Sequence, residues 1–350
     1  MTSLASESER TAKQPVNWLR GRWGAAGIIA ALYSGVHVLW TFVHWGGEAS
    51  QAAISDIAFL PVSLFAALAA FRIWTQPGAD RSTRLAWGLL GLGLLANFFG
   101  DLLWFYYEIL LHSEPFPSWA DLGYLAFYPL MMLALFNFPH SPVSRSDQQR
   151  LYLDSAIVLV ASWMVLWYFV LGPTVEGLTL SLESAIILAY PLADLVIVYG
   201  LVIFLFRHPN ASLRSGFGFL LAAMLLFVVA DVLYSIQGLN ETYVSGNPLD
   251  NFWLLSYLCF VFAALEQCAN LQMHGSRFKA ARRVSYWWML PYAMLAAGYA
   301  LAIWAFAVST GIDSRGRGLF GGAVTLTVLI SWRQVLELRE NRRLNKELLL

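Results

Sequence analysis

The sequence predicts an all-α polytopic membrane protein with about ten transmembrane helices. Hydrophobic residues make up 58% of the 350 positions and charged residues only 13%. The mean hydropathy of +0.58 lies outside the usual balance of a soluble domain. Apolar segments of bilayer-spanning length recur along the chain, and a group of carboxylates and aromatic residues recurs about 130 positions apart. We therefore expect two parallel four-helix repeats, two extra helices and a C-terminal cytoplasmic signalling helix.

The apolar segments follow a polar N-terminal tail at residues 1–22. The first segment is too long for the core of a signal peptide and lacks a convincing cleavage site, so we predict that it is retained as a helix. The segments are 23–45, 53–74, 85–110, 119–138, 152–172, 184–206, 215–238, 249–270, 286–309 and 318–334. They group into repeat 1 (23–138), repeat 2 (152–270) and two additional helices (286–334), followed by the cytoplasmic signalling helix (335–350).

Lysine and arginine predict the orientation, because basic residues near helix ends remain on the cytoplasmic side. The connections between the predicted helices fall into two alternating sets. One set holds only two basic residues, Arg315 and Arg317. Both tails and every second connection carry the remaining basic groups, namely Arg20 and Arg22, 72–84, Arg145 and Arg150, Arg207 and Arg214, 277–283 and 333–346. Both termini are therefore predicted to be cytoplasmic.

The two repeats carry the same polar pattern at helical spacing. The matched residues are Asp101 with Asp231, Trp104 with Tyr234, Asp121 with Asp250, Tyr124 with Trp253, and Tyr128 with Tyr257. In the first repeat Glu108 lies one further helical turn beyond Trp104. Because each repeat has an even number of helices, both enter the membrane in the same direction, which puts a pseudo-symmetry axis along the membrane normal.

Asp101 and Asp231 lie deep within apolar segments, far from any predicted helix start. An ionisable group at that depth costs several kcal/mol unless it has a partner, so it indicates a functional site. The alternative is a structural polar clamp between helices. Asp154, near the start of the fifth predicted helix, is expected to pair with a basic loop rather than with a ligand.

Asp121 and Asp250 have a local explanation, because each follows a good helix N-cap by three residues. The sequences are Ser118-Trp119-Ala120-Asp121 and Asn247-Pro248-Leu249-Asp250. Both resemble capping boxes, the second with proline at the first helical position. A structural role in capping and a role in ligand binding both stay open for this pair.

Carboxylates greatly outnumber basic groups on the predicted outer side, so they cannot all be salt-bridged. Buried ones must be protonated, held by Tyr, Trp or backbone donors, or face a cation or polar ligand. Some aromatic residues belong to the interfacial belt, but those in register with the aspartates suit the walls of an outward-facing cavity. Such a cavity fits a small neutral or cationic molecule or a proton. The candidate ligand-binding residues are Asp101, Trp104, Glu108, Asp121, Tyr124, Tyr128, Asp231, Tyr234, Asp250, Trp253 and Tyr257.

No cofactor is identified: a retinal Schiff base is excluded, and haem binding and intramembrane proteolysis are weak alternatives. A retinal Schiff base needs an intramembrane lysine, but all three lysines lie outside the apolar segments. The histidines offer no convincing pair of haem ligands. Gly100-Asp101 is too short a match to intramembrane aspartyl proteases, because Phe98 stands where their motif needs glycine. We predict no catalytic domain, no metal site and no nucleic-acid partner in this segment.

After the predicted helix that contains GDLLW comes the stretch PFPSWADLGYLAFYPL. This part of the chain resembles the membrane input regions of bacterial diguanylate cyclases and related sensor proteins. Those proteins carry GGDEF, EAL, PAS or histidine-kinase output. The resemblance implies a multi-pass protein of the bacterial inner membrane with a cytoplasmic output domain as partner. The chain reaches Leu350 without such a domain, so the resemblance implies an input module without its output, whether by truncation or by nature.

The C-terminal sequence after Trp332 contains no glycine or proline, so the tenth helix should continue unbroken out of the membrane. A spacing typical of a coiled-coil seam predicts a homodimer that relays the signal through Leu338, Asn341, Asn345 and Leu348. A solvated amphipathic tail is the alternative.

The main functional hypothesis is a sensory input module. A proton-coupled small-molecule transporter is the alternative, because parallel repeats with matched carboxylates describe such carriers as well.

Overall fold

The computed structural model describes residues 21–43, 45–47, 50–139, 145–176, 181–207, 215–273, 289–308 and 314–348. Within these ranges the regular elements are helices, and no strand occurs. Ten helical stretches there are long and apolar enough to cross a membrane. The predicted all-α class and the ten apolar helices are therefore confirmed. The predicted tail at 1–22 falls almost entirely outside the described residues.

The helix bounds agree with the predicted apolar segments to within a few residues at most ends. π-helical turns at Tyr106–Leu110 and Trp167–Leu171 continue two of the helices. The helices are α2 (Arg22–Val43), α3 (Gln51–Trp74), α4 (Arg81–Phe105), α5 (Ala120–Asn137), α6 (Arg145–Leu166), α7 (Gly172–Glu176), α8 (Leu182–Arg207), α9 (Ser215–Leu239), α10 (Asp250–Met273), α11 (Leu290–Val308) and α12 (Ser314–Leu348). The predicted unbroken continuation of the last helix is confirmed, because α12 runs for 35 residues.

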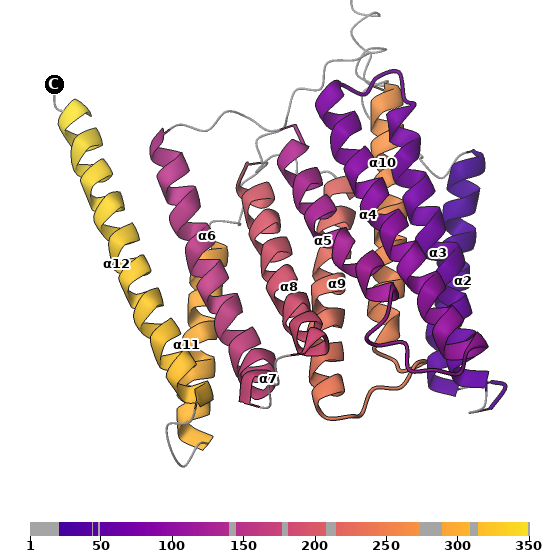
Figure 1. Cartoon of the computed structure of the whole chain (residues 1–350). Helices are drawn as coiled ribbons and strands as arrows, with labels where there is room; N and C mark the ends of the chain where they lie inside the picture. The colour runs from indigo at the N-terminus through magenta and orange to yellow at the C-terminus, as the bar shows by residue number, and fades with distance from the viewer. Residues whose placement is uncertain are drawn as a thin grey trace, which may run out of the picture.

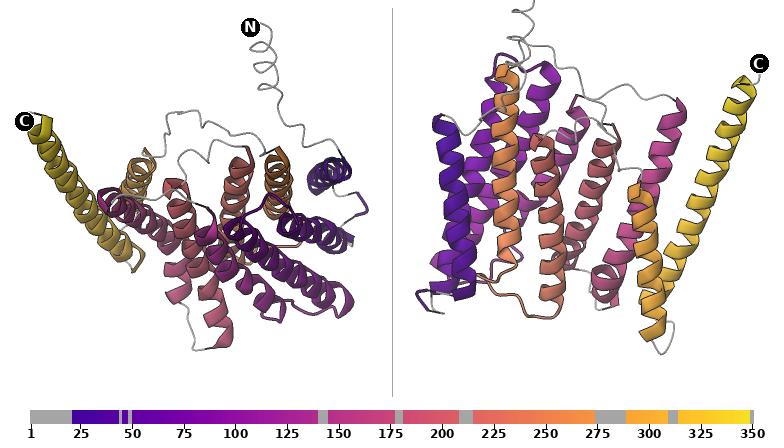
Figure 2. Two further views of the ribbon diagram at one scale, coloured as in Figure 1. Left: turned by 90° about the horizontal axis from the view of Figure 1, so that it is seen from above. Right: turned by 180° about the vertical axis from the view of Figure 1, so that it is seen from behind.

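The axes of the helices are roughly aligned with one another, and α12 lies at one edge of the molecule (Figures 1 and 2). α4 packs against α3 and α5, and α10 packs against α2, α3 and α9. α8 contacts α5, α6 and α9. The group α3–α5 therefore meets the group α8–α10 chiefly where α3 packs against α10 and α5 packs against α8.

A large apolar core fills the space among α3, α4, α5, α8, α9 and α10. Ala66, Ala67 and Ala70 of α3 are almost fully buried in it. Small residues of this kind let the backbones of apolar helices approach closely. Phe127 of α5 and Phe227 of α9 pack with ring centroids 4.7 Å apart, so the core joins the two groups of helices directly.

A second, smaller core joins α6, α11 and α12 and includes Ile157, Met164 and Leu326. Within this unit Asp154 of α6 accepts a hydrogen bond from Arg333 Nε at 2.5 Å, and both side chains are buried. The prediction that Asp154 pairs with a residue of a basic loop is wrong, because its partner lies in a helix. The counter-charge comes from within α12, because the packing of α12 on α6 places Arg333 opposite it.

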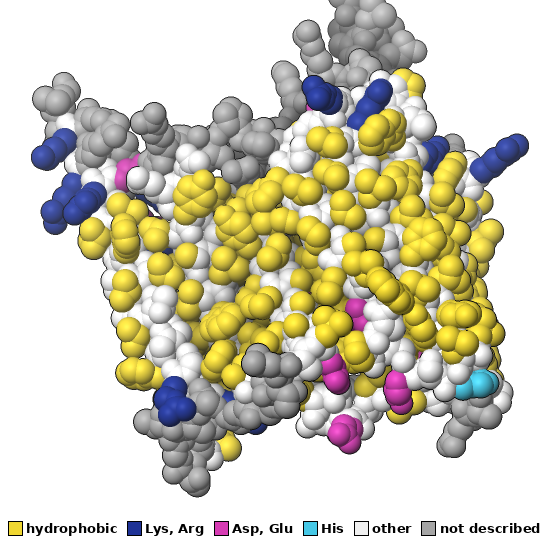
Figure 3. All heavy atoms as spheres, in the orientation of Figure 1, with side chains coloured by type: hydrophobic (Ala, Val, Ile, Leu, Met, Phe, Trp, Pro, Cys, Tyr) yellow, Lys and Arg dark blue, Asp and Glu magenta, His cyan; other side chains and the backbone are white. Residues whose placement is uncertain are grey.

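On the face shown in Figure 3, most of the acidic side chains lie at the end opposite to most of the basic ones. Figure 3 shows apolar side chains over the middle of the molecule and Lys and Arg side chains along the end toward which α12 projects. Asp and Glu side chains gather at the other end, together with a few basic ones. Leu32, Phe42 and Ile303 are at least two-thirds exposed. An exposed apolar band of this kind is typical of a surface that contacts a membrane or another protein.

Candidate functional site

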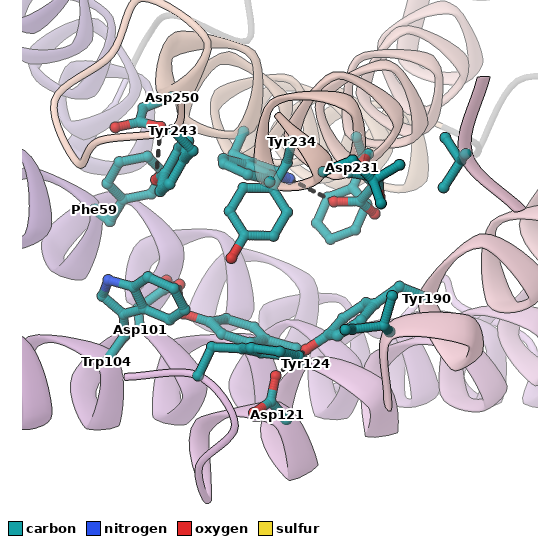
Figure 4. Close-up of a pocket in the computed structure, with 18 of the residues that line it drawn as sticks. Phe59, Asp101, Trp104, Asp121, Tyr124, Tyr190, Asp231, Tyr234, Tyr243 and Asp250 are labelled. Atoms are coloured by element: carbon teal, nitrogen blue, oxygen red, sulfur yellow. Dashed lines mark hydrogen bonds between the residues drawn. The ribbon is translucent and has the colours of Figure 1, made fainter. Parts of the chain in front are cut away.

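A cavity of about 360 Å³ lies where α3–α5 meet α8–α10. Figure 4 shows Asp121 and Tyr190 on one side of it, and Tyr243 bonded to Asp250 on another. Among the described residues that line it there is no lysine or arginine. Carboxylates and aromatic rings dominate the lining, namely Asp56, Asp101, Asp121, Glu183, Asp231, Asp250, Phe59, Trp104, Phe116, Tyr124, Tyr128, Tyr190, Phe227, Tyr234, Tyr243, Trp253 and Tyr257.

Each candidate residue from the sequence except Glu108 lines this cavity. Glu108 lies in the π-helical turn that continues α4 and accepts hydrogen bonds from Trp104 Nε1 at 2.6 Å and from Ser245 Oγ at 2.9 Å. It therefore holds the Trp104 indole and the segment before α10 in place. Glu108 bonds to Trp104 one helical turn away, as its spacing predicts, but it is not among the residues that line the cavity.

Asp101 is held where α4 and α5 cross at very short distance. A Cβ added at Gly123 of α5 would lie 2.6 Å from the Ala96 carbonyl oxygen, and one added at Gly100 would lie 2.6 Å from the Tyr124 ring. This close approach lets the Tyr124 hydroxyl donate to Asp101 Oδ1 at 3.3 Å. The glycine before Asp101 thus has a packing role, which accounts for the Gly-Asp pair without protease chemistry.

Asp231 has stronger hydrogen bonds than Asp101. Trp253 of α10 donates from Nε1 to Oδ1 at 2.8 Å, and Tyr128 of α5 donates from its hydroxyl to Oδ2 at 2.6 Å. Both carboxyl oxygens are therefore satisfied, and the three side chains tie α5, α9 and α10 together. Asp194 of α8 is buried close to Asp231, and neither of its carboxyl oxygens has a hydrogen-bond partner among the described residues.

Asp121 and Asp250 each combine helix capping with a contact in the cavity. Asp121 Oδ2 accepts from the Ser118 backbone N–H at 2.7 Å, as the predicted capping box requires. Asp250 Oδ2 accepts instead from the Gly246 N–H at 2.7 Å, one residue before the predicted Asn247. The remaining oxygens face the cavity, where Asp121 Oδ1 accepts from Tyr190 at 2.6 Å and Asp250 Oδ1 from Tyr243 at 3.1 Å.

Sequence reasoning missed Asp56, Tyr190 and Tyr243, which also line the cavity. Asp56 of α3 is 8% exposed, and no described residue donates a hydrogen bond to its buried Oδ2. Its position within an apolar segment was a usable signal, because a carboxylate there is costly without a partner and therefore indicates a functional site. Tyr190 and Tyr243 had no such signal, since tyrosines are common near the ends of membrane helices.

The Tyr243 hydroxyl is a hydrogen-bond donor at the cavity. Tyr243 lies in the segment between α9 and α10, where burial raises the pKa of its hydroxyl well above the ordinary value, so it remains a protonated donor. No group of three or more His, Cys, Asp or Glu side chains able to hold a metal ion occurs among the described residues.

Comparison of the chain with protein-family models, curated proteins and solved structures found no match.

Proposed function

We propose that this chain is a membrane-embedded sensory input module that binds a small molecule in the cavity and signals through α12 to a cytoplasmic output domain. The observation that carries this proposal is that one helical stretch reaches both sites. Val170 and Thr174, in the turns that follow α6, line the cavity, whereas Asp154 in the middle part of α6 is paired with Arg333 of α12. A ligand that displaces this stretch therefore acts on α12 through packed, bonded side chains.

The proposal includes a multi-pass location in the bacterial inner membrane, which the ten apolar helices support. Lys and Arg gather at the end toward which α12 projects, so this end is taken as cytoplasmic. The α4–α5 and α9–α10 connections lie at the other end (Figure 1). Phe116 and Tyr243 from these connections line the cavity, which in this orientation faces outward.

We also propose that residues 23–138 and 152–270 are duplicated units related by an axis along the membrane normal. Two donor–acceptor pairs at matched positions support this relation, because Tyr124 donates to Asp101 and Trp253 donates to Asp231. Matched helices also make matched contacts, α3 with α10 and α8 with α5. The ligand would then bind at the interface of the two units, as in other repeat membrane proteins.

A homodimer would complete the signalling path. An apolar stripe on α12 is exposed to the surroundings, and its members include Phe320, Val324, Val328 and Trp332. Leu338 is 58% exposed, and Asn341 and Asn345 beyond it are exposed as well. We propose that α12 pairs with α12 of a second chain along this side, in addition to contacting the lipid bilayer.

The test uses a cavity-filling substitution in place of an unknown ligand. Thr174→Trp fills the cavity from the end of the α6 stretch, whereas Ile29→Trp, on the exposed side of α2, is the matched control. Single cysteines at Leu338, Asn341 and Asn345, with Cys259 and Cys268 replaced by alanine, report cross-linking between chains in membranes. We expect Thr174→Trp to change the cross-linking pattern and Ile29→Trp to leave it unchanged. Identical patterns in folded protein would contradict transmission from the cavity to α12.

A proton-coupled small-molecule transporter is the second candidate, because buried carboxylates at matched positions in two halves also suit alternating access. The two proposals differ in whether solute crosses the membrane. Uptake of radiolabelled choline, a small cation suited to an acidic cavity, into proteoliposomes under a pH gradient separates them. Saturable uptake that Asp101→Asn removes would favour the transporter.

A further inference from the structure

Asp101 and Asp231 occupy matched sequence positions but have different hydrogen-bond partners. Asp231 receives a donor on each oxygen, at 2.8 and 2.6 Å. Asp101 receives one long hydrogen bond of 3.3 Å on Oδ1, and its Oδ2 is buried without a partner among the described residues. Normal O–H···O bonds are about 2.7–2.8 Å long. Asp101 is therefore poorly satisfied within the chain, although only 9% of its surface is exposed.

Asp56 presents the same deficiency on the neighbouring helix. Its Oδ2 is also buried and unpartnered, it lines the same cavity, and it lies close enough to Asp101 for the two carboxyls to interact. α3 and α4, which carry them, pack against one another. Buried polar atoms in native structures almost always have a partner, so two unsatisfied carboxyl oxygens at one cavity wall indicate a missing donor or cation.

The chain itself does not supply that cation within the part that the structure describes. No Lys, Arg or His lines the cavity, and the ion pairs among the described residues belong to α6 and α12. Ser63 and Tyr257 lie near Asp101, but neither makes a hydrogen bond of normal geometry to Oδ2. A ligand with a positive charge and N–H or N–CH₃ groups would fill this place.

The other walls favour an organic cation over a metal ion. Phe59 and Tyr257 meet edge to face with ring centroids 6.3 Å apart, and Trp104 and Tyr124 lie with centroids 6.5 Å apart. Figure 4 shows Asp101 and Trp104 across the cavity from Phe59. Aromatic faces around a carboxylate attract ammonium groups by cation–π interaction, and a cavity of about 360 Å³ holds a small organic molecule.

We propose that the cavity binds a small organic monocation, an alkyl- or quaternary ammonium compound, with its charged group beside Asp56 and Asp101 and its apolar part against the aromatic walls. Asp231 then serves as a structural clamp between helices and not as the cation ligand. This inference rests on the proposed binding function of the cavity and specifies the chemical class of its ligand.

The experiment measures binding to the full chain in lipid nanodiscs by calorimetry. Choline is the probe, and 3,3-dimethyl-1-butanol, which has the same shape without the charge, is its matched control. We expect choline to bind at least tenfold more tightly than the alcohol. Equal affinities would overturn the proposal on the wild-type chain alone, so this comparison does not depend on whether any variant folds.

Single substitutions locate the charged group. Loss of one charged partner should weaken choline binding roughly tenfold to a hundredfold in Asp56→Asn and in Asp101→Asn. Glu114→Gln, which removes an exposed carboxylate that does not line the cavity, is the matched control and should bind like the wild type. If both Asp56→Asn and Asp101→Asn keep wild-type affinity in folded protein, the assignment is wrong.

The two experiments together distinguish a wrong ligand class from a wrong sensory proposal. If the cavity-filling substitution Thr174→Trp alters α12 cross-linking while choline and other ammonium probes do not bind, the sensory module stands and the ligand class is wrong. If choline binds through Asp56 and Asp101 and no cross-linking change occurs with choline or with Thr174→Trp, the ligand class stands and the transmission through α12 is wrong.

Discussion

The cavity among α3–α5 and α8–α10 and the joint of α6 with α11 and α12 both bury carboxylates, but they neutralise them differently. In the joint Asp154 has a cationic partner, Arg333, which also bonds Glu337 at 2.7 Å. In the cavity Asp101 and Asp231 receive only neutral donors from tyrosine and tryptophan. A paired buried charge is a fixed structural contact, whereas an unpaired one at a cavity is available to a ligand. This difference is the basis for the proposed mechanical role of the joint and the proposed binding role of the cavity.

The largest effect is expected when the joint is broken. Arg333→Leu leaves Asp154 buried without its counter-charge, which should lower the free energy of unfolding by about 3–5 kcal/mol. Thermal or denaturant unfolding in detergent measures this change. The double variant Asp154→Leu, Arg333→Leu should recover most of the loss, because two apolar side chains of similar volume often replace a buried pair without penalty. A small effect of Arg333→Leu would show that the pair is not the fixed contact of the joint.

Asp101 and Asp231, the matched aspartates of the cavity, should differ in their effect on stability. Asp231→Leu leaves the Tyr128 and Trp253 donors without an acceptor, and each buried unsatisfied donor costs about 1–3 kcal/mol. Asp101→Leu removes one long hydrogen bond and an unpartnered carboxyl oxygen, so its destabilisation should be smaller by at least about 1 kcal/mol. The same unfolding measurement compares them. Equal losses, or a larger loss in Asp101→Leu, would contradict the assignment of Asp231 as the clamp.

The close crossing of α4 and α5 that positions Asp101 offers a further test. In Gly123→Ala the added Cβ meets backbone atoms, the Ala96 oxygen at 2.6 Å and the Gly100 nitrogen at 2.9 Å, so the helices must separate. Overpacking of this kind typically destabilises by about 1–3 kcal/mol. Gly218→Ala in α9 is the control, because its Cβ would meet nothing within 4 Å and alanine favours the helix. Choline affinity should fall with Gly123→Ala and stay unchanged with Gly218→Ala.

The smallest effect on stability is expected at the outer face of α12. Leu338 is 58% exposed, so Leu338→Gln should change the free energy of unfolding of the monomer by no more than about 0.5 kcal/mol. The same variant should lower cross-linking between chains from a cysteine at Asn345. A large loss of monomer stability would mean that Leu338 packs within its own chain, and unchanged cross-linking would argue against pairing along this face.

The helices themselves were predictable from the sequence because their signals are local. A run of apolar residues of spanning length defines α8 or α10 without reference to any neighbour, and the Ser118 and Asp121 spacing predicts how α5 begins. The continuation of α12 follows from residues without glycine or proline. The candidate cavity residues followed from the same periodicity, since it assigns Asp101 and Trp104 to one helix face.

The partners of those residues were not predictable, because they depend on how helices rotate and pack. The sequence alone determined that Asp101, Asp231 and Asp154 are carboxylates in apolar helices that need a partner. Only the tertiary structure decided that Arg333 reaches Asp154 across 179 positions and Tyr128 reaches Asp231 across 103, while Asp101 keeps a buried oxygen without a donor. The physical reason is that helical periodicity specifies a direction around one helix axis, whereas a hydrogen bond of about 3 Å between helices requires the packing of every side chain between them.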